Sequence, residues 1–228
     1  MNEKTFAMLK DEIIEKKLFQ LYQKADQQNF ALFRHYLPKM LSYLLGKGFR
    51  WDNKNLTFYD DKYIPISPYQ GIWLYLQARA IQANTIVEFG TSFGISTIFL
   101  AKAVKDNGGG TVIGTEMVKS KIKAAKKNLQ DAGISEYTSI LEGDARLTLQ
   151  EIEKPVDMLI VDGFPNYALD ILKIVSPKLR KGAIVIADNI NTFKSTLTGY
   201  LDYLQNSENG FITSTLPFKD GTEFSVKV

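Results

Sequence analysis

One segment, residues 85–97, constrains the fold of this chain more than any other. It reads TIVEFGTSFGIST: a short, β-branched apolar run ends at Glu88, and a turn between Gly90 and Gly94 precedes a new apolar pattern at helical spacing. This order predicts a strand, a tight turn and a helix. Glycine lets the backbone approach a ligand closely, and the first turn of the helix offers unpaired N–H groups to it. We therefore expect a nucleotide-like ligand over this turn.

The spacing of the glycines argues against two common ligand classes. A dinucleotide fingerprint needs a small residue where this chain has Thr97, and a phosphate-binding loop needs a Gly-Lys-Ser/Thr ending that the segment lacks. A carboxylate at Glu88 would repel a phosphate, but it suits an ammonium group or a ribose hydroxyl. S-adenosylmethionine carries an ammonium group and no phosphate, so it fits better than a dinucleotide. The alternative is an ordinary βα turn without a ligand.

Length and composition are typical of one soluble domain. The chain has 228 residues, of which 45% are hydrophobic and 23% charged, enough for one sizeable core. Its net charge of +3 is too small to argue for nucleic acid. Without cysteine, and with His35 as the single histidine, the chain cannot form disulfides, thiolate zinc sites or multi-histidine metal sites. No apolar run reaches membrane-spanning length, so we predict a cytoplasmic protein with no membrane contact.

Helix and strand patterns alternate along most of the chain. Apolar stripes predict helices over residues 4–46, with Pro38 kinking or splitting the second of them. After the run that ends at Glu88, strands are predicted at 111–115, 138–141, 158–161 and 183–187, and helices at 69–82, 119–132, 147–152, 167–179 and 196–204. This alternation implies a mostly parallel sheet covered on both faces. Two last strands, 211–216 and 222–228, flank an Asp-Gly turn and predict an antiparallel hairpin at the sheet edge.

The chain divides into an extension and a main part. We assign residues 1–64 to an N-terminal helical extension, which could form a lid, and residues 65–228 to the ligand-binding domain.

Five predicted parallel strands end in an acidic residue: Glu88, Glu116, Asp144, Asp162 and Asp188. Ligands of open parallel sheets bind at the carboxyl ends of the strands, so these side chains should converge on one crevice. A carboxylate at Glu116 can accept hydrogen bonds from both ribose hydroxyls, and Asp144 would lie near an adenine. Capping of the following helix is the alternative role for both.

Asp162, Asp188 and Asn189 are a candidate cation site. Two carboxylates and an amide oxygen are hard ligands that suit Mg²⁺ or Ca²⁺. Such an ion would hold an acceptor hydroxyl and lower its pKa. An Asx-type turn at residues 188–189 is the alternative, and the periodicity does not choose between the two.

Six segments resemble the class I S-adenosylmethionine-dependent methyltransferases, and among them the cation-dependent O-methyltransferases related to the catechol and caffeoyl-CoA enzymes. They are SPYQG (67–71), VEFGTSFGIST (87–97), GDA (143–145), IVDG (160–163), LRKGAIVIADN (179–189) and LPFKDG (216–221). The resemblance implies a Rossmann-like α/β fold with a seven-stranded, mostly parallel sheet in the order 3-2-1-4-5-7-6. It also implies methyl transfer from S-adenosylmethionine to a small hydroxylated, catechol-like or phenol-like acceptor, and a homodimer.

The resemblance assigns roles residue by residue. It gives Asp162 a catalytic role and makes Asp162, Asp188 and Asn189 the ligands of a Mg²⁺ or Ca²⁺ ion. The predicted cofactor contacts are Ile66, Ser67, Glu88, Gly90, Thr91, Ser92, Gly94, Ser96, Glu116, Met117, Gly143, Asp144, Ala145 and Asp162.

The chain departs from this family at the general base. Relatives carry a lysine three residues after the first metal-binding aspartate, where this chain has Pro165. Metal activation alone, Tyr167 or Lys194 are the alternatives for removing the acceptor proton. The short link after Asn189 argues against a bulky coenzyme A ester as acceptor.

Two other functions are open at this stage. The first is methylation of tRNA or another RNA, suggested by a run of basic residues: Lys119, Lys121, Lys123, Lys126 and Lys127. Their helical spacing is more typical of a solvated face, and no stacking aromatics interleave with them. The second is a cofactor-binding protein that has lost catalysis with the lysine replaced by Pro165.

Overall fold

The fold is a single sheet with helices on both faces. The computed structural model describes residues 3–44, 57–152, 155–218 and 220–228. Within these residues seven strands form one sheet in the order β3-β2-β1-β4-β5-β7-β6, which confirms the predicted order. The strands are β1 (Thr85–Phe89), β2 (Thr111–Glu116), β3 (Thr138–Glu142), β4 (Val156–Val161), β5 (Leu179–Ala187), β6 (Phe211–Leu216) and β7 (Thr222–Lys227). Strands β1 to β5 run parallel, and β7 pairs antiparallel with both β5 and β6.

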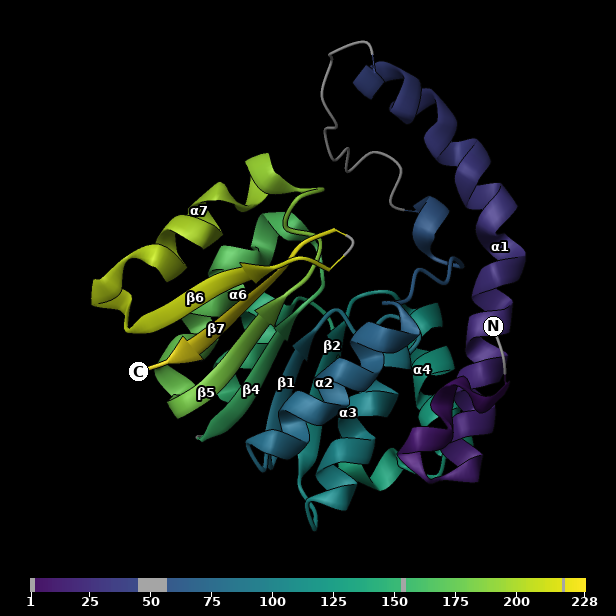
Figure 1. Cartoon of the computed structure of the whole chain (residues 1–228), viewed down its shortest axis with the longest axis horizontal. Coiled ribbons are helices and arrows are strands. Elements are labelled where there is room, and N and C mark those ends of the chain that lie inside the picture. The colour runs from purple at the N-terminus through teal and green to yellow at the C-terminus, as the bar shows by residue number, and fades with distance from the viewer. Residues whose placement is uncertain (1–2, 45–56, 153–154, 219) are drawn as a thin grey trace.

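The helices form two layers (Figure 1). One layer contains α2 (Pro68–Ala80), α3 (Ile95–Asp106) and α4 (Lys119–Asp131), and the other contains α5 (Ala145–Thr148), α6 (Ala168–Val175) and α7 (Lys194–Gln205). Short 3₁₀ turns are η1 (Glu3–Leu9), η3 (Ser135–Tyr137), η4 (Leu149–Glu151), η5 (Pro165–Tyr167), η6 (Ser176–Lys178) and η7 (Ser207–Asn209). The central strands are apolar on both sides, since Ile86 and Ile160 pack in the first layer while Val87 and Leu159 pack in the second. No helix in the described part of the chain has the length and apolarity that a bilayer span needs.

Within the N-terminal extension, the described residues 3–44 form a short 3₁₀ turn followed by one long helix. Helix α1 (Glu12–Leu44) runs along the side of the molecule next to α3 and α4 (Figure 1). Ion pairs of Lys17 with Asp131 (2.9 Å) and of Asp11 with Lys105 (3.1 Å) attach it there. The helix continues through Pro38, so the prediction of a split at that residue is wrong. A proline removes one backbone donor, and a 33-residue helix accommodates that loss.

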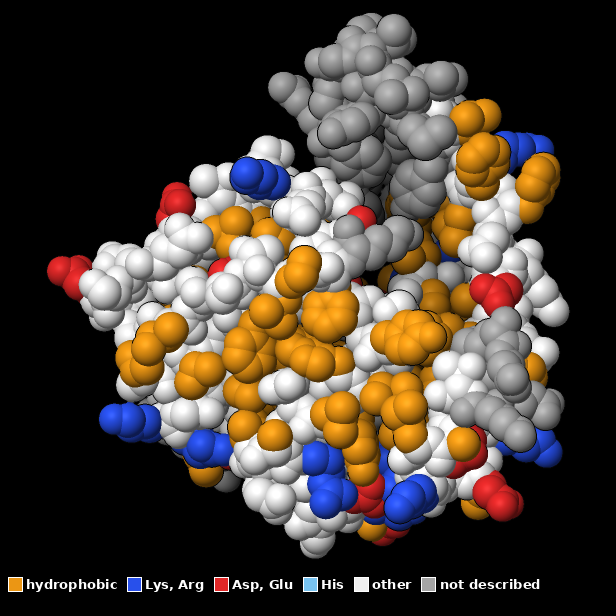
Figure 2. Space-filling model, in the orientation of Figure 1, with side chains coloured by type: hydrophobic (Ala, Val, Ile, Leu, Met, Phe, Trp, Pro, Cys, Tyr) orange, Lys and Arg blue, Asp and Glu red, His pale blue; other side chains and the backbone are white. Residues whose placement is uncertain are grey.

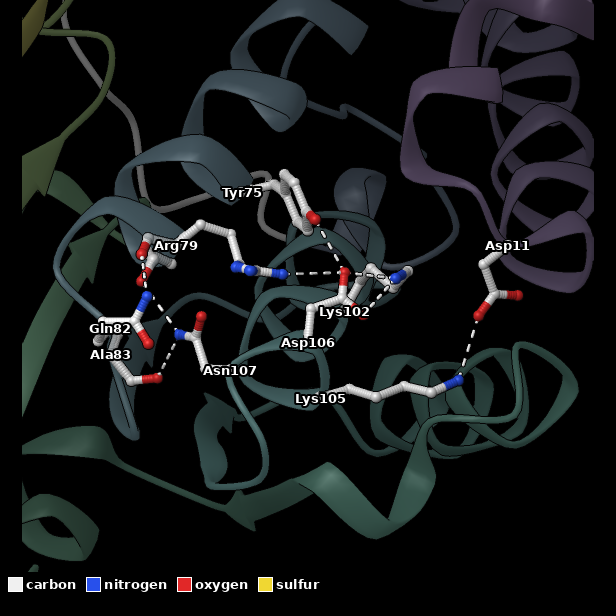
Figure 3. Close-up of polar contacts among 10 residues, drawn as sticks. Asp11, Tyr75, Arg79, Gln82, Ala83, Lys102, Lys105, Asp106 and Asn107 are labelled. Atoms are coloured by element: carbon white, nitrogen blue, oxygen red, sulfur yellow. Dashed lines mark hydrogen bonds and ion pairs between the residues drawn. The ribbon is translucent and has the colours of Figure 1, made fainter.

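A polar cluster joins the C-terminal ends of α2 and α3 (Figure 3). The carboxylate of Asp106 pairs with Lys102 and Arg79 and accepts a hydrogen bond from the Tyr75 hydroxyl (2.8 Å). The Asn107 amide donates to two carbonyl groups at the end of α2, at 2.8 and 3.2 Å. Because the opposite ends of both helices meet at the carboxyl edge of the sheet, this cluster fixes the helices that border the candidate site.

We expect Asp106→Asn to lower the free energy of unfolding by about 2 kcal/mol, because it leaves the buried Lys102 without its anion. Although partial burial opposes the shift, hydrogen bonds from Lys102 and Tyr75 lower the pKa of Asp106. The stability that the Asp106 carboxylate contributes should therefore be present above its unfolded pKa, near 4. It should be lost as the pH falls through the lower pKa of the folded state. Urea unfolding at pH 7 and pH 3 measures this, with the exposed Asp202→Asn as control. An equal effect of Asp106→Asn at both pH values would contradict it.

Hydrophobic side chains gather on one surface over α2, β6 and β7 (Figure 2). Tyr69 and Leu76 of α2 are 77% and 53% exposed, and Ile212 of β6 is 68% exposed. The Trp73 ring packs against the Phe218 ring on the neighbouring hairpin, with the ring centroids 5.2 Å apart. The described helices leave this surface open to solvent.

Candidate cofactor and acceptor site

The predicted turn after β1 is present, and each of its glycines has a separate physical reason. Gly90 has a φ of +101°, and a Cβ atom added to it would lie 2.6 Å from the Asp162 carbonyl oxygen. Gly94 caps the N-terminus of α3 with a φ of +83°, and a Cβ atom there would have room. Glycine is therefore required at position 90 because the backbone that follows β4 leaves no space for a side chain. At position 94 space is available, and glycine is favoured there by the positive φ.

Glu88 is fully buried at the end of β1 and is only half satisfied. Its Oε2 accepts hydrogen bonds from the hydroxyls of Thr91 (3.0 Å) and Thr97 (2.5 Å), whereas its Oε1 has no hydrogen-bond partner among the described residues. Burial raises the pKa of Glu88, against the effect of hydroxyl groups that include Ser96. A buried acceptor without a partner is costly, and the ammonium group of S-adenosylmethionine would satisfy it. This carboxylate therefore fits the predicted cofactor.

Glu116 is held across the turn by backbone amides. Its Oε2 accepts from the Ser92 N–H (2.9 Å), and its Oε1 accepts from the N–H groups of Met117 and Val118 (2.9 Å each). A carboxylate has about four lone-pair sites, so three amides leave room for about one more donor. The predicted ribose contact is compatible with this geometry, although two ribose hydroxyls would compete for the same oxygen.

Both carboxylate oxygens of Asp144 are engaged in contacts with a residue close in sequence. It caps α5 by accepting from the Arg146 N–H (2.9 Å), and its two oxygens bind the Arg146 guanidinium at 2.6 to 3.1 Å. The hydrogen-bonded guanidinium lowers the pKa of Asp144. Arg146 in turn lies 4.0 Å over the Tyr167 ring. The capping role is thus confirmed, and the Arg146–Tyr167 stack is a feature of this edge that the sequence analysis missed.

The predicted cation ligands lie together at the ends of β4 and β5. The Asn189 amide donates to Asp162 Oδ1 (3.3 Å), while Asp188 Oδ1 accepts from the Gln70 amide (3.1 Å) and the Thr222 hydroxyl (2.9 Å). Burial, and then the charge of Asp188, raise the pKa of Asp162 well above its ordinary value. Burial likewise raises the pKa of Asp188. A buried carboxylate whose pKa is raised by the charge of a second carboxylate is a favourable setting for a cation.

The oxygen atoms of Asp162, Asp188 and Asn189 are of the type that binds a divalent cation, but in this structure they do not all point toward one common centre. Among the described residues, no three His, Cys, Asp or Glu side chains form a metal-binding group. An ion would need Asp162, Asp188 and the amide oxygen of Asn189, whose Nδ2 faces Asp162. Turning that amide over would present its oxygen, and substrate or water oxygens would complete the shell.

A small cavity of about 20 Å³ lies beside this cluster. Its lining includes Ile66, Gln70 and Trp73, together with Asp162 and Asp188. The volume is enough for about one water molecule, so a larger acceptor has to approach from the open side or displace side chains. Sequence reasoning missed Gln70, Trp73 and Thr222 as neighbours of the site, although Gln70 lies within the matching SPYQG segment.

The remaining predicted residues border the same edge of the sheet. Ser67 caps α2 in a capping box with Gln70, and Ser96, Thr91 and Ala145 are buried. Gly143 has a φ of +117°, and Met117 is 48% exposed.

The alternative bases and the basic run have ordinary surroundings. Pro165 begins η5, Lys194 is exposed at the start of α7, and the Tyr167 ring is stacked on Arg146. The basic residues of α4 face largely outward, and Lys127 pairs with Asp131 at 2.7 Å. Exposure of these lysines is expected both for a solvated face and for an RNA-binding surface, so the preference for a solvated face stays a prediction.

Comparison with known proteins points to methyltransferases. Residues 87–190 match the family model described as a methyltransferase domain. The chain is 32% identical to a catechol O-methyltransferase of Mycobacterium tuberculosis over 128 residues, which are 56% of this chain and 57% of that protein. A catechol O-methyltransferase of Niastella koreensis is also 32% identical, over 131 residues that make up 56% and 58% of the two chains. The matched region thus spans little more than half the length of these relatives.

A solved structure agrees with the observed fold. The O-methyltransferase from Bacillus cereus, in complex with SAH, superposes with a TM-score of 0.69 and 21% identity over 83% of this chain and 96% of that one. At this identity the likeness concerns the fold alone. The chain therefore has the strand order and overall fold of the class I methyltransferases, and the relatives that its sequence matches over about half of its length are O-methyltransferases.

Proposed function

We propose that this protein transfers a methyl group from S-adenosylmethionine to a hydroxyl oxygen of a small catechol-like or phenol-like acceptor, with a divalent cation at Asp162, Asp188 and Asn189. The observation that carries the proposal is the half-satisfied Glu88 carboxylate next to the Asp162–Asp188 pair. This arrangement would bring the cofactor's ammonium group to the end of one strand and the acceptor's hydroxyl to the end of the neighbouring strand. The catechol O-methyltransferase relatives support the acceptor class.

The chemistry needs few protein groups. A C–O bond forms as the S–CH₃ bond breaks and the hydroxyl proton passes to solvent water, so the products are the methylated acceptor and S-adenosylhomocysteine. The turn and Glu88 would fix the sulfonium side, and Asp162 would orient the acceptor oxygen toward the methyl group. A cation bound to the acidic cluster would lower the pKa of the acceptor hydroxyl. Such help suits a chain with Pro165 in place of the family's lysine.

Turnover with and without metal tests the proposal. The protein is incubated with S-adenosylmethionine, Mg²⁺ and a panel of catechols and phenols, and S-adenosylhomocysteine is measured. We expect product that falls at least tenfold when a chelator removes the cation and returns when Mg²⁺ is restored. Product that is unaffected by chelator would contradict the cation, and cofactor binding without product on any acceptor would favour the non-catalytic alternative. The homodimer and the cytoplasmic location stay predictions.

A further inference from the structure

Two side chains of α1 hold the segment that leads into α2. The Gln28 side-chain amide donates to the Asp61 carbonyl (3.0 Å), and its oxygen accepts from the Tyr63 N–H (2.8 Å). One glutamine thus pairs with two backbone groups, as a neighbouring strand would. Three residues after Tyr63, the Ile66 carbonyl accepts a hydrogen bond from the Tyr22 hydroxyl (2.9 Å). Tyr22 itself is buried.

The held segment, residues 61–67, touches both halves of the candidate site. The Tyr63 ring stacks on the Phe93 ring with centroids 3.8 Å apart and planes 14° apart. Phe93 belongs to the turn between Gly90 and Gly94, and its carbonyl accepts from the Asn128 amide (2.9 Å). At the other end of the segment, Ile66 lines the cavity beside Asp162 and Asp188.

The segment needs support from outside itself. Residues 62–67 form neither helix nor strand, so their backbone polar groups obtain few partners from the segment's own chain. An unsupported loop samples many conformations, and ordering it opposes binding. Where only a fraction of the molecules has the binding conformation, the apparent dissociation constant rises by the inverse of that fraction.

We propose that Gln28 and Tyr22 are positioning residues for the cofactor, which hold residues 61–67 in the conformation that covers the turn. The inference rests on the proposed function, because it takes S-adenosylmethionine as the ligand of that turn. It gives α1 a role in cofactor affinity although the helix stands beside the sheet and not over the strand ends that carry the acidic residues (Figure 1).

Calorimetric titration with S-adenosylmethionine tests this on the full chain. We expect Gln28→Ala to raise the dissociation constant roughly tenfold, and Tyr22→Phe, which removes a single hydrogen bond, to raise it roughly threefold. The adjacent Gln27 is exposed, so Gln27→Ala is a matched control that should leave the constant unchanged. The kcat at saturating cofactor should stay within twofold of wild type while the KM for S-adenosylmethionine rises. Hydrogen exchange should show faster exchange of the Tyr63 amide in Gln28→Ala alone.

The outcomes separate the two proposals. If wild type does not bind S-adenosylmethionine, the proposed function fails and this inference falls with it. If wild type binds and Gln28→Ala binds within twofold of Gln27→Ala, only the positioning role is overturned. A fall in kcat without a change in the dissociation constant would overturn it too. Should Gln28→Ala not fold, Tyr22→Phe, which keeps the buried ring, decides by the same criterion.

Discussion

Asp162→Asn is expected to lower methyl transfer by roughly 10²- to 10³-fold and yet to raise the melting temperature of the metal-free protein. The first effect follows because the substitution removes the charge that would hold the cation and orient the acceptor. The second follows because it removes a partly buried carboxylate that is destabilised by burial and by the charge of Asp188. A gain of about 1 kcal/mol corresponds to a rise of about 2–4 °C for a domain of this size.

The pH dependence of this gain has a definite sign. Burial and Asp188 raise the pKa of Asp162 in the folded chain above its unfolded value near 4. The stability that this group contributes is present below the unfolded pKa and is lost as the pH rises through the folded pKa. The advantage of Asp162→Asn should therefore be present at pH 7 and vanish near pH 4.

Differential scanning fluorimetry and the turnover assay check both effects. Added Mg²⁺ should raise the melting temperature of wild type but not that of Asp162→Asn. The exposed Asp170 on α6 provides the control Asp170→Asn, which should keep wild-type activity and wild-type response to Mg²⁺. An Asp162→Asn protein that is less stable than wild type at pH 7 would show that the carboxylate pair stabilises the fold without a cation, against our expectation.

Gly90→Ala is expected to destabilise the fold by about 3 kcal/mol and to weaken S-adenosylmethionine binding more than tenfold. The added Cβ would lie 2.6 Å from a backbone carbonyl of Asp162, which cannot rotate away as a side chain would. Either β4 or the turn must move, and both belong to the candidate site. Thermal unfolding and calorimetric titration measure the two effects, with a fall of roughly 10 °C in melting temperature.

Gly133→Ala separates the clash from the backbone conformation. Gly133 also has a positive φ, of +67°, but no atom lies within 4 Å of an added Cβ there. We expect this control to cost about 1 kcal/mol and to leave cofactor binding unchanged. Equal losses of stability in Gly90→Ala and Gly133→Ala would mean that the turn relaxes without displacing β4.

Strand ends were the most predictable part of the site. Glu88, Asp162 and Asp188 follow strongly apolar β-branched runs, and parallel strands bring their carboxyl ends to one edge, so spacing along the chain was enough to bring these residues together. The order of the strands, by contrast, came from resemblance, since periodicity finds strands but does not arrange them. The predicted contacts of each residue with S-adenosylmethionine stay predictions.

Interactions between distant segments were not predictable from local patterns. Gln28 and Gln27 look alike in the sequence, and only the packing of α1 distinguishes them. The start of β5 was missed because Arg180 and Lys181 interrupt the apolar run. There the register with β4 shifts, and Arg180 binds Asp157 at 2.5 Å. A charged pair at a strand irregularity resembles a loop when only hydrophobicity is read.

The apolar surface over α2, β6 and β7 bears on how the protein behaves at high concentration. Strand β6 ends the sheet order, and its sequence, FITSTL, contains no charged residue. An edge strand without charged residues has no electrostatic barrier to pairing with another chain, and β6 also exposes the apolar side chain of Ile212. We therefore expect self-association at high concentration to occur through this edge. Ile212→Lys would introduce a charge that repels a second molecule there.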